Sequence, residues 1–146
     1  MLNDSIKVTG ELRITVTNPE GNIKQEIVVP NLVVTTGKNF IASRMKDTAD
    51  TAMSHMAIGS GSTAAAVGDT ALETELGRVS LTSTTVTDNA VAYVATFPAG
   101  TGTGAVTEAG ILNASSSGTL LCRTVFSVIN KGAADTLGIT WTVTVN

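Results

Sequence analysis

The segment that most constrains the fold is 136–145, in which apolar and polar side chains alternate without interruption. One face carries Leu137, Ile139, Trp141, Val143 and Val145, whereas the other carries only glycine and threonine. A period of two is the pattern of a β-strand. Because one face is wholly apolar, this strand must lie over a hydrophobic core, and a shift in register by one residue would expose the entire apolar set.

The same alternation recurs upstream and predicts a protein built of strands. Residues 6–17 place Val8, Leu12, Ile14 and Val16 on one face, and 18–21 (NPEG) form a turn that leads into a hairpin partner at 23–29. Pro30 cannot donate to a sheet ladder, so it predicts an edge strand or a bend. Further strands are expected at 32–34, 53–58, 78–86, 90–97, 106–112 and 119–129.

Two short helices are also expected. Residues 37–46 place apolar side chains at helical spacing, with Thr36 as a candidate cap. Residues 70–76 begin with Thr70 and Glu73 at the spacing of a capping box.

The predicted fold class is therefore all-β and mainly antiparallel: a β-sandwich or jelly-roll-like domain with one or two short helices. Its 146 residues have the size of one domain, so 1–146 is treated as a single β-sandwich domain, with 1–7 as a candidate N-terminal arm. Apolar residues make up 42% of the chain, enough for a core, whereas charged residues make up only 14%. Threonine and valine are abundant, which favours strands over helices.

Several classes of function are excluded by these totals. A net charge of −3 and a pI near 5.0 leave no basic footprint for nucleic acid. No apolar run approaches the roughly 18 residues that a membrane helix requires, and the first residues lack the features of a secretory signal. A single cysteine cannot form an internal disulfide.

The residues that could carry catalysis or bind a metal are few. Cys122 and His55 are the only residues of their kinds, and a thiol–imidazole pair is one active-site hypothesis. Cys122, however, alternates with Leu120, Phe126 and Val128 in an apolar strand, so we interpret it as a core residue. His55 with Asp47 and Asp50 lacks the spacing of a metal site. We therefore predict no catalytic residue, no metal and no cofactor.

Other chemical motifs are equally weak. The segment 59–64 matches a dinucleotide-binding pattern but lacks the helix and parallel strand that this pattern requires, and 100–104 is interpreted as a connection. Glu73 and Glu75 are two residues apart on the expected helix, a spacing typical of a solvated face rather than of a hydrolase pair. A sugar-binding platform would need exposed aromatic rings, and Tyr93 is expected to be internal. The chain is thus predicted not to be an enzyme.

Three stretches carry a resemblance to a known group: 18–45 (NPEGN…SRM), 56–78 (MAIGSGSTAAAVGDTALETELGR) and 106–145 (VTEAG…TVTV). Together they resemble small β-rich virion structural proteins of tailed bacteriophages, which serve as capsid decoration (cement) proteins or in tail and head fibres. The resemblance implies a location in the virion, assembly in the bacterial host cytoplasm, and no catalytic residues.

On this basis we expect a capsid decoration protein that forms a homo-oligomer and docks across the capsomers of the major capsid protein, with no nucleic acid or membrane partner. Outward threonines and few charges lower the desolvation cost of such contacts. The glycine-containing loops 59–63 and 100–104 are candidate contact segments. The alternatives are a tail fibre, head fibre or baseplate attachment module and, from a different class, a host-glycan binding module.

Overall fold

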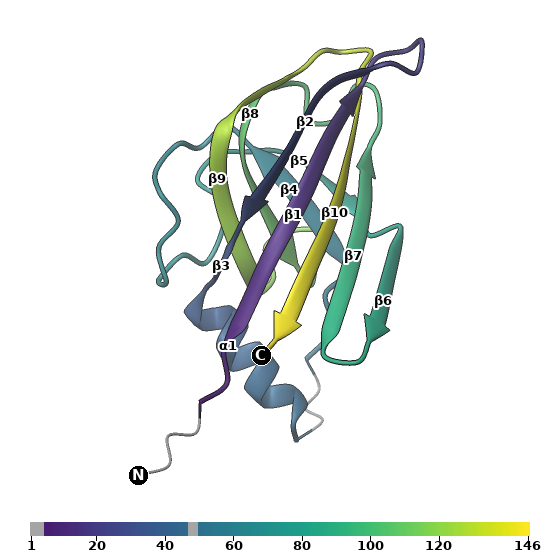
Figure 1. Ribbon diagram of the computed structural model, residues 1–146. Coiled ribbons are helices and arrows are strands. Elements are labelled where there is room, and N and C mark those ends of the chain that lie inside the picture. The colour runs from purple at the N-terminus through teal and green to yellow at the C-terminus, as the bar shows by residue number, and fades with distance from the viewer. Residues whose placement is uncertain (1–4, 47–49) are drawn as a thin grey trace.

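The computed structural model describes residues 5–46 and 50–146 and shows two five-stranded antiparallel sheets packed face to face, with one helix at the lower end (Figure 1). This arrangement confirms the predicted all-β class and is a β-sandwich. The alternation of apolar and polar residues explains the two layers, because each sheet turns its apolar face toward the other.

The first sheet has the strand order β2-β1-β10-β7-β6. Its strands are β1 (Val8–Thr17), β2 (Ile23–Pro30), β6 (Ser83–Thr87), β7 (Ala90–Phe97) and β10 (Thr136–Val145). β10 lies in the middle, between β1 and β7, as its wholly apolar face predicts.

The second sheet has the order β3-β9-β8-β4-β5. Its strands are β3 (Leu32–Val33), β4 (His55–Gly59), β5 (Glu75–Ser80), β8 (Gly104–Leu112) and β9 (Leu120–Lys131). The chain passes from β2 to β3 at Pro30, so the proline marks both the end of an edge strand and the bend between the two sheets.

The core between the sheets is continuous. Trp141 faces Leu12 of β1 and Tyr93 of β7 across the ladder, and its side chain is fully buried. Its indole Nε1–H donates a hydrogen bond to Asn31 Oδ1 at 3.0 Å, which satisfies the one polar atom of the side chain. The prediction that Trp141 belongs to the core is confirmed.

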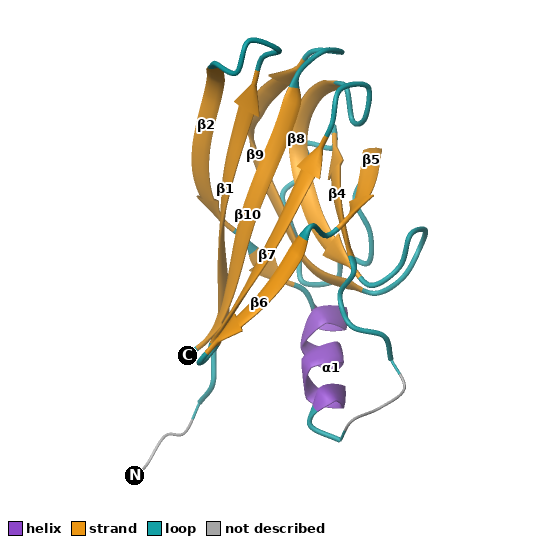
Figure 2. Cartoon of the chain, turned by 90° about the vertical axis from the view of Figure 1, so that its right-hand side faces the viewer, coloured by secondary structure: helices purple, strands orange, loops and turns teal. Residues whose placement is uncertain are grey.

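The helix α1 (Thr35–Arg44) begins two residues earlier than predicted. Thr36 is not its cap: it lies inside the first turn, and its hydroxyl donates to the Leu120 carbonyl of β9. The helix packs beside β9 at the lower end of the sandwich, where Phe40 is buried against the core (Figure 2).

The predicted helix over 70–76 is wrong. Residues 70–74 form an irregular segment, and β5 begins at Glu75. The capping-box residue Glu73 instead accepts backbone hydrogen bonds from Ser62 and Thr63, across the loop. The carboxylate therefore closes a loop of 60–74 rather than capping a helix.

The predicted single strand over 78–86 is also wrong, because it is two strands in different sheets. β5 ends at Ser80 in the second sheet and β6 begins at Ser83 in the first. In β9, register shifts opposite β8 break the simple alternation expected for Cys122 and its neighbours. Leu120 consequently packs in a separate small cluster, and Val128 is exposed.

The N-terminal arm predicted for 1–7 lies partly outside the described residues, which begin at Ser5. Lys7 exchanges backbone hydrogen bonds with Asn146, so the described start of the chain lies beside the end of β10. Within the described part of the chain, no helix is long and apolar enough to cross a membrane.

Candidate functional site

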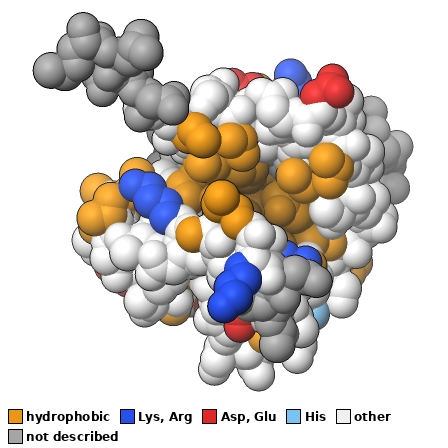
Figure 3. All heavy atoms as spheres, turned by 90° about the horizontal axis from the view of Figure 1, so that it is seen from below, with side chains coloured by type: hydrophobic (Ala, Val, Ile, Leu, Met, Phe, Trp, Pro, Cys, Tyr) orange, Lys and Arg blue, Asp and Glu red, His pale blue; other side chains and the backbone are white. Residues whose placement is uncertain are grey.

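An apolar groove opens at the lower end of the sandwich, between α1 and the ends of the first sheet's strands. Its volume is about 220 Å³. Figure 3 shows hydrophobic side chains gathered in the middle of this end of the molecule. The apolar residues that line it come from five elements, β1, α1, β7, β9 and β10: Val8, Phe40, Ile41, Val91, Tyr93, Leu121, Val143 and Val145. α1 packs mainly against β9 at this end, and the groove lies between the helix and the strands of the first sheet.

A second hollow of about 460 Å³ adjoins the groove and shares Val8 and Ile41 with it. Its remaining lining includes Ile6, whose side chain is 74% exposed, and two cations, Lys7 and Lys38. Met45, at the end of α1, is 90% exposed. Apolar surface therefore continues from the groove onto the outside of the molecule.

The rim of this end is basic. Lys7 and Lys38 border the second hollow, Arg44 lines the groove with its guanidinium 5.9 Å from the Phe40 ring centroid, and Lys46 follows α1. Within residues 5–46 and 50–146, these four cations form no ion pair.

The other five cations of the chain are engaged elsewhere. Arg13, Lys24, Arg78 and Arg123 form salt bridges, and the buried Lys131 donates to two backbone carbonyls. Among the described residues, the exposed cations that form no ion pair thus lie at this end of the molecule, and one of them, Arg44, donates to the Asp50 backbone carbonyl. We call this surface, formed by the groove, the adjoining hollow and the four cations, the basic-rimmed groove.

The aromatic side chains of the chain are packed in the core and are not exposed on the surface. Tyr93 is 8% exposed, and burial raises the pKa of its phenol to about 12, so it stays neutral. Phe40, Phe97, Phe126 and Trp141 are buried as well. The expectation that Tyr93 is internal is confirmed, and no described ring offers the exposed platform that a sugar would stack upon.

A second cluster of polar residues lies on the outer face of the second sheet, under the loop 60–74. Glu108 of β8 is fully buried, and its carboxylate accepts hydrogen bonds from the backbone N–H groups of Gly61, Glu73 and Thr74. Arg123 Nε of β9 donates to the same carboxylate at 3.0 Å. A buried charge is tolerated only when it is paired and hydrogen-bonded in this way.

Arg123 links the sheet to the loop at a second point. Its guanidinium donates to Asp69 and to the Thr63 carbonyl. Burial acts to lower the pKa of Arg123, but the hydrogen bonds to Asp69 and Glu108 outweigh it and raise the pKa above its usual value. We call Glu108, Arg123 and Asp69 the loop clasp, because together they fix 60–74 to the sheet.

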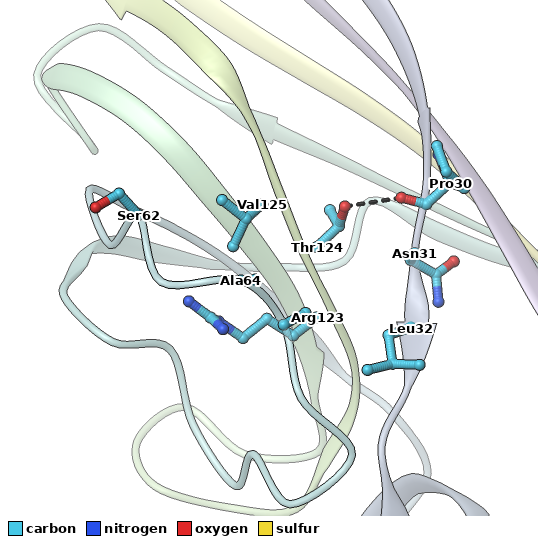
Figure 4. Close-up of a pocket in the computed structure, with 9 residues that line it drawn as sticks. Pro30, Asn31, Leu32, Ser62, Ala64, Arg123, Thr124 and Val125 are labelled. Atoms are coloured by element: carbon cyan, nitrogen blue, oxygen red, sulfur yellow. Dashed lines mark hydrogen bonds between the residues drawn. The ribbon is translucent and has the colours of Figure 1, made fainter.

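A hollow of about 320 Å³ lies beside the loop clasp, bordered by Asn31, Ala64, Arg123 and Thr124 (Figure 4). Arg123 points toward the loop, where all its partners are protein groups. Thr124 donates to the Pro30 carbonyl. The guanidinium at this hollow is therefore already hydrogen-bonded to Glu108, Asp69 and the Thr63 carbonyl.

The structure separates the residues that were considered, and set aside, as catalytic or metal-binding candidates. Cys122 faces the core between the sheets, where burial raises the pKa of its thiol, whereas His55 lies on the opposite face of β4. The imidazole contacts Ser54 Oγ at 2.7 Å and Ser80 Oγ at 3.4 Å. Asp47 lies outside the described residues. Among those described, no three His, Cys, Asp or Glu side chains gather as metal ligands would.

The two glycine-containing loops are fixed by protein contacts. In 59–63, a Cβ on Gly61 would collide with Glu108 Oε2, so only glycine lets the amide reach the carboxylate. In 100–104, Gly100, Gly102 and Gly104 have φ values of +84°, +70° and +140°, which makes the segment a tight connection, as predicted.

Glu73 and Glu75 make separate local contacts, with the loop backbone and with Arg78 respectively.

Comparisons of the chain with protein-family models, with curated proteins and with solved structures find no match. Function is therefore inferred from the chain's own surfaces.

Proposed function

We propose that this protein is a non-catalytic virion structural protein of a tailed bacteriophage that stabilises the head as a decoration (cement) protein. The observation that carries the proposal is the basic-rimmed groove, a built docking surface on a β-sandwich whose other cations are already engaged. The resemblance of 18–45, 56–78 and 106–145 to small phage virion proteins supports the same role.

In this proposal the groove receives an apolar segment flanked by acidic side chains, presented by the major capsid protein. The apolar side chains of the segment fill the space between α1 and β10. Its carboxylates meet Lys7, Lys38 and Arg44, which form no ion pair within the described residues; Arg44 also donates a hydrogen bond to the Asp50 backbone carbonyl at 2.8 Å. Burial of the groove supplies binding free energy, and the surrounding cations supply orientation and rate of encounter.

The surface of the sandwich suits repeated docking. The outward face of β10 consists of threonine and glycine, and that of β1 carries three threonines together with Glu11 and Arg13, of which Arg13 is already paired with Glu26. Such faces carry little charge to desolvate when subunits meet. Many weak contacts of identical subunits, each spanning a capsomer junction, add up to a stable shell. Assembly takes place in the bacterial host cytoplasm, and the protein stays in the virion.

The test compares virions made from a phage genome that carries this coding sequence with virions made after its deletion. The deletion should yield heads that rupture at lower temperature or milder osmotic shock, and added purified protein should restore the resistance. Hundreds of bound copies per particle are expected for decoration. A handful of copies at the tail would replace this proposal with the fibre or baseplate alternative.

The groove itself is tested by Val145→Asp, which places a carboxylate among the apolar groove residues at a side chain that is 40% exposed. Val28→Asp, at 46% exposure on the outer face of β2, is the matched control. Val145→Asp should abolish binding to deleted heads while Val28→Asp binds normally. Equal binding by both folded variants would refute docking through the groove.

A further inference from the structure

The two sheets have four edge strands, and three of them are protected against adding a further strand. β2 carries Lys24 and Glu26, ends in Pro30, and has a bulge opposite β1. β5 carries the Glu75–Arg78 ion pair and a bulge opposite β4. β3 has two residues, and the chain beside it is covered where Thr35 N–H donates to the Val67 carbonyl of the loop 60–74. Charges, proline, bulges and covering loops are the usual devices that blunt edges.

β6 (Ser83–Thr87) has none of these devices. It pairs with β7 on one side only, contains no charged residue or proline, and keeps regular register over its whole length. All five of its residues are exposed, and Val86 is 70% exposed. Figure 2 shows β6 at the outer margin of the first sheet. An antiparallel strand with one neighbour leaves alternate N–H and C=O groups unpaired along its free edge.

We propose that β6 is a dimerisation edge, at which a second copy of this chain adds its own β6 antiparallel about a twofold axis. The two first sheets then become one continuous sheet across the interface. With Thr85 on the axis, Thr84 faces Val86 of the other copy and Ser83 faces Thr87. Asp88, next in the chain, falls opposite Thr82, so no like charges meet.

A second copy fits this edge for two reasons. β6 carries no charge by which it could select a foreign segment. The β6 of a second copy is equally neutral and matches it residue for residue. In addition, Val86 lies directly opposite Val91, a residue that lines the basic-rimmed groove. Pairing at β6 covers this exposed valine and sets the two grooves of the dimer on either side of the new interface. The inference concerns the isolated protein and does not depend on the proposed function.

The experiment measures the mass of the purified chain by sedimentation across concentrations up to about 1 mM. The wild type should form a dimer of 14.9 kDa chains. Val86→Lys, which places a charge at the centre of the edge, should weaken the dimer at least tenfold. Val28→Lys, the same change on the protected edge β2, should leave it intact. Circular dichroism confirms that both variants are folded.

A second variant tests the register. Thr85→Cys places two thiols across the twofold axis, close enough for a disulfide under mild oxidation, whereas the native Cys122 is buried and stays reduced. A covalent dimer from Thr85→Cys, absent from the wild type, supports the pairing. A wild type that stays monomeric throughout the range, a dimer insensitive to Val86→Lys, or a lack of cross-linking in a dimeric Thr85→Cys variant would each overturn it.

Discussion

At the scale of single residues, the most informative side chain is Glu108, a fully buried carboxylate on a strand with no other charged residue. Its partners are three backbone N–H groups and Arg123, whose side chain is 3% exposed. Such a pair gives little net stability compared with apolar residues of the same size, but removal of one partner leaves the other charge buried and uncompensated. The loop clasp is thus a device that specifies one position for the loop 60–74.

Glu108→Gln should lower the free energy of unfolding by about 3 kcal/mol, because Arg123 loses its buried counter-charge while the shape of the side chain is kept. Urea denaturation measures the change. The control is Glu26→Gln, which breaks the exposed Arg13–Glu26 pair and should cost less than about 1 kcal/mol. Equal costs for the two variants would show that the loop clasp is not a buried charge pair.

Gly61 and Gly68 lie in the same loop and offer a matched test of close approach. A Cβ at Gly61 collides with Glu108 and Glu73, whereas a Cβ at Gly68 meets nothing within 4 Å. Gly61→Ala should therefore destabilise the protein by about 1–3 kcal/mol. Gly68→Ala should be neutral or stabilise slightly, since it restricts the unfolded chain. Thermal unfolding of both variants measures the change in stability. A loss of stability in Gly68→Ala as large as that in Gly61→Ala would contradict the prediction.

The lowered pKa of Asp135 predicts how the stability of the folded protein responds to acid. Hydrogen bonding from Lys24, and then from the Gly132 backbone, lowers the pKa of its carboxyl below the usual 3.8. The unfolded chain therefore takes up this proton first, so the stabilisation is complete above about pH 4 and is lost as the pH falls through the folded-state pKa. Asp135→Asn should have a lower melting temperature than wild type near neutral pH, with the gap closing as the pH falls below 3.8, the usual pKa of the group. A gap that stays constant with pH would assign the effect to packing alone.

At the scale of elements, the sequence predicted strands well wherever alternation was long and unbroken. β1, β7 and β10 appear at or within two residues of their predicted bounds, because one buried face fixes both their type and their register. The exposed and short elements were harder to predict. The split of 78–86 into β5 and β6 depends on which sheet each half joins, which is a property of the tertiary structure rather than of local pattern.

The missed helix at 70–76 shows how a local signal can be overridden. Thr70 and Glu73 do have the spacing of a capping box, but the amides of Glu73 and Thr74 bond instead to Glu108, far along the chain. The available signal was a charged residue in each of two apolar strands, Glu108 in 106–112 and Arg123 in 119–129. Opposite charges in strands that pair predict a buried ion pair, although their link to the loop could not be deduced.

The groove was missed for a similar reason. Its lining comes from β1, α1, β7, β9 and β10, which contribute residues from both ends of the chain. Only the placement of α1 beside β9 leaves this end of the sandwich open, and no local pattern encodes that placement. The cluster of Lys38, Arg44 and Lys46 was visible in the sequence, but its lack of ion pairs with the other described residues was not.

Hydrogen exchange tests whether the loop clasp holds the whole loop 60–74 in place. The amides of Gly61, Glu73 and Thr74 bond to a fully buried carboxylate and should exchange slowly, whereas that of Ala66 bonds to the Asp69 carboxylate, which is 25% exposed, and should exchange faster. In Glu108→Gln the first three should exchange at least about tenfold faster relative to Leu12 in the core. Unchanged relative rates would mean that the loop is held by other contacts.

At the scale of the whole molecule, charge is distributed unevenly: within the part of the chain that the structure describes, the exposed cations without an ion pair lie at one end, near an apolar groove. Interactions between exposed charges are screened within about 10 Å at 0.1 M salt and about 3 Å at 1 M, whereas apolar burial is not weakened by screening. Docking through this end should consequently have a salt-sensitive rate of association and a salt-tolerant residual affinity.

The separate contributions of charge and of apolar burial to docking can be measured with two charge-neutralising variants. Lys38→Gln removes one rim cation, so its binding to deleted phage heads should be slower at low salt and less steeply dependent on salt than that of wild type. Arg13→Gln removes a cation already paired with Glu26 on the outer face of β1, and its salt dependence should match wild type. Surface plasmon resonance on immobilised heads gives both rates. If the two variants changed the salt dependence equally, the attraction would come from net charge, and the arrangement of cations around the groove would have no part in recognition.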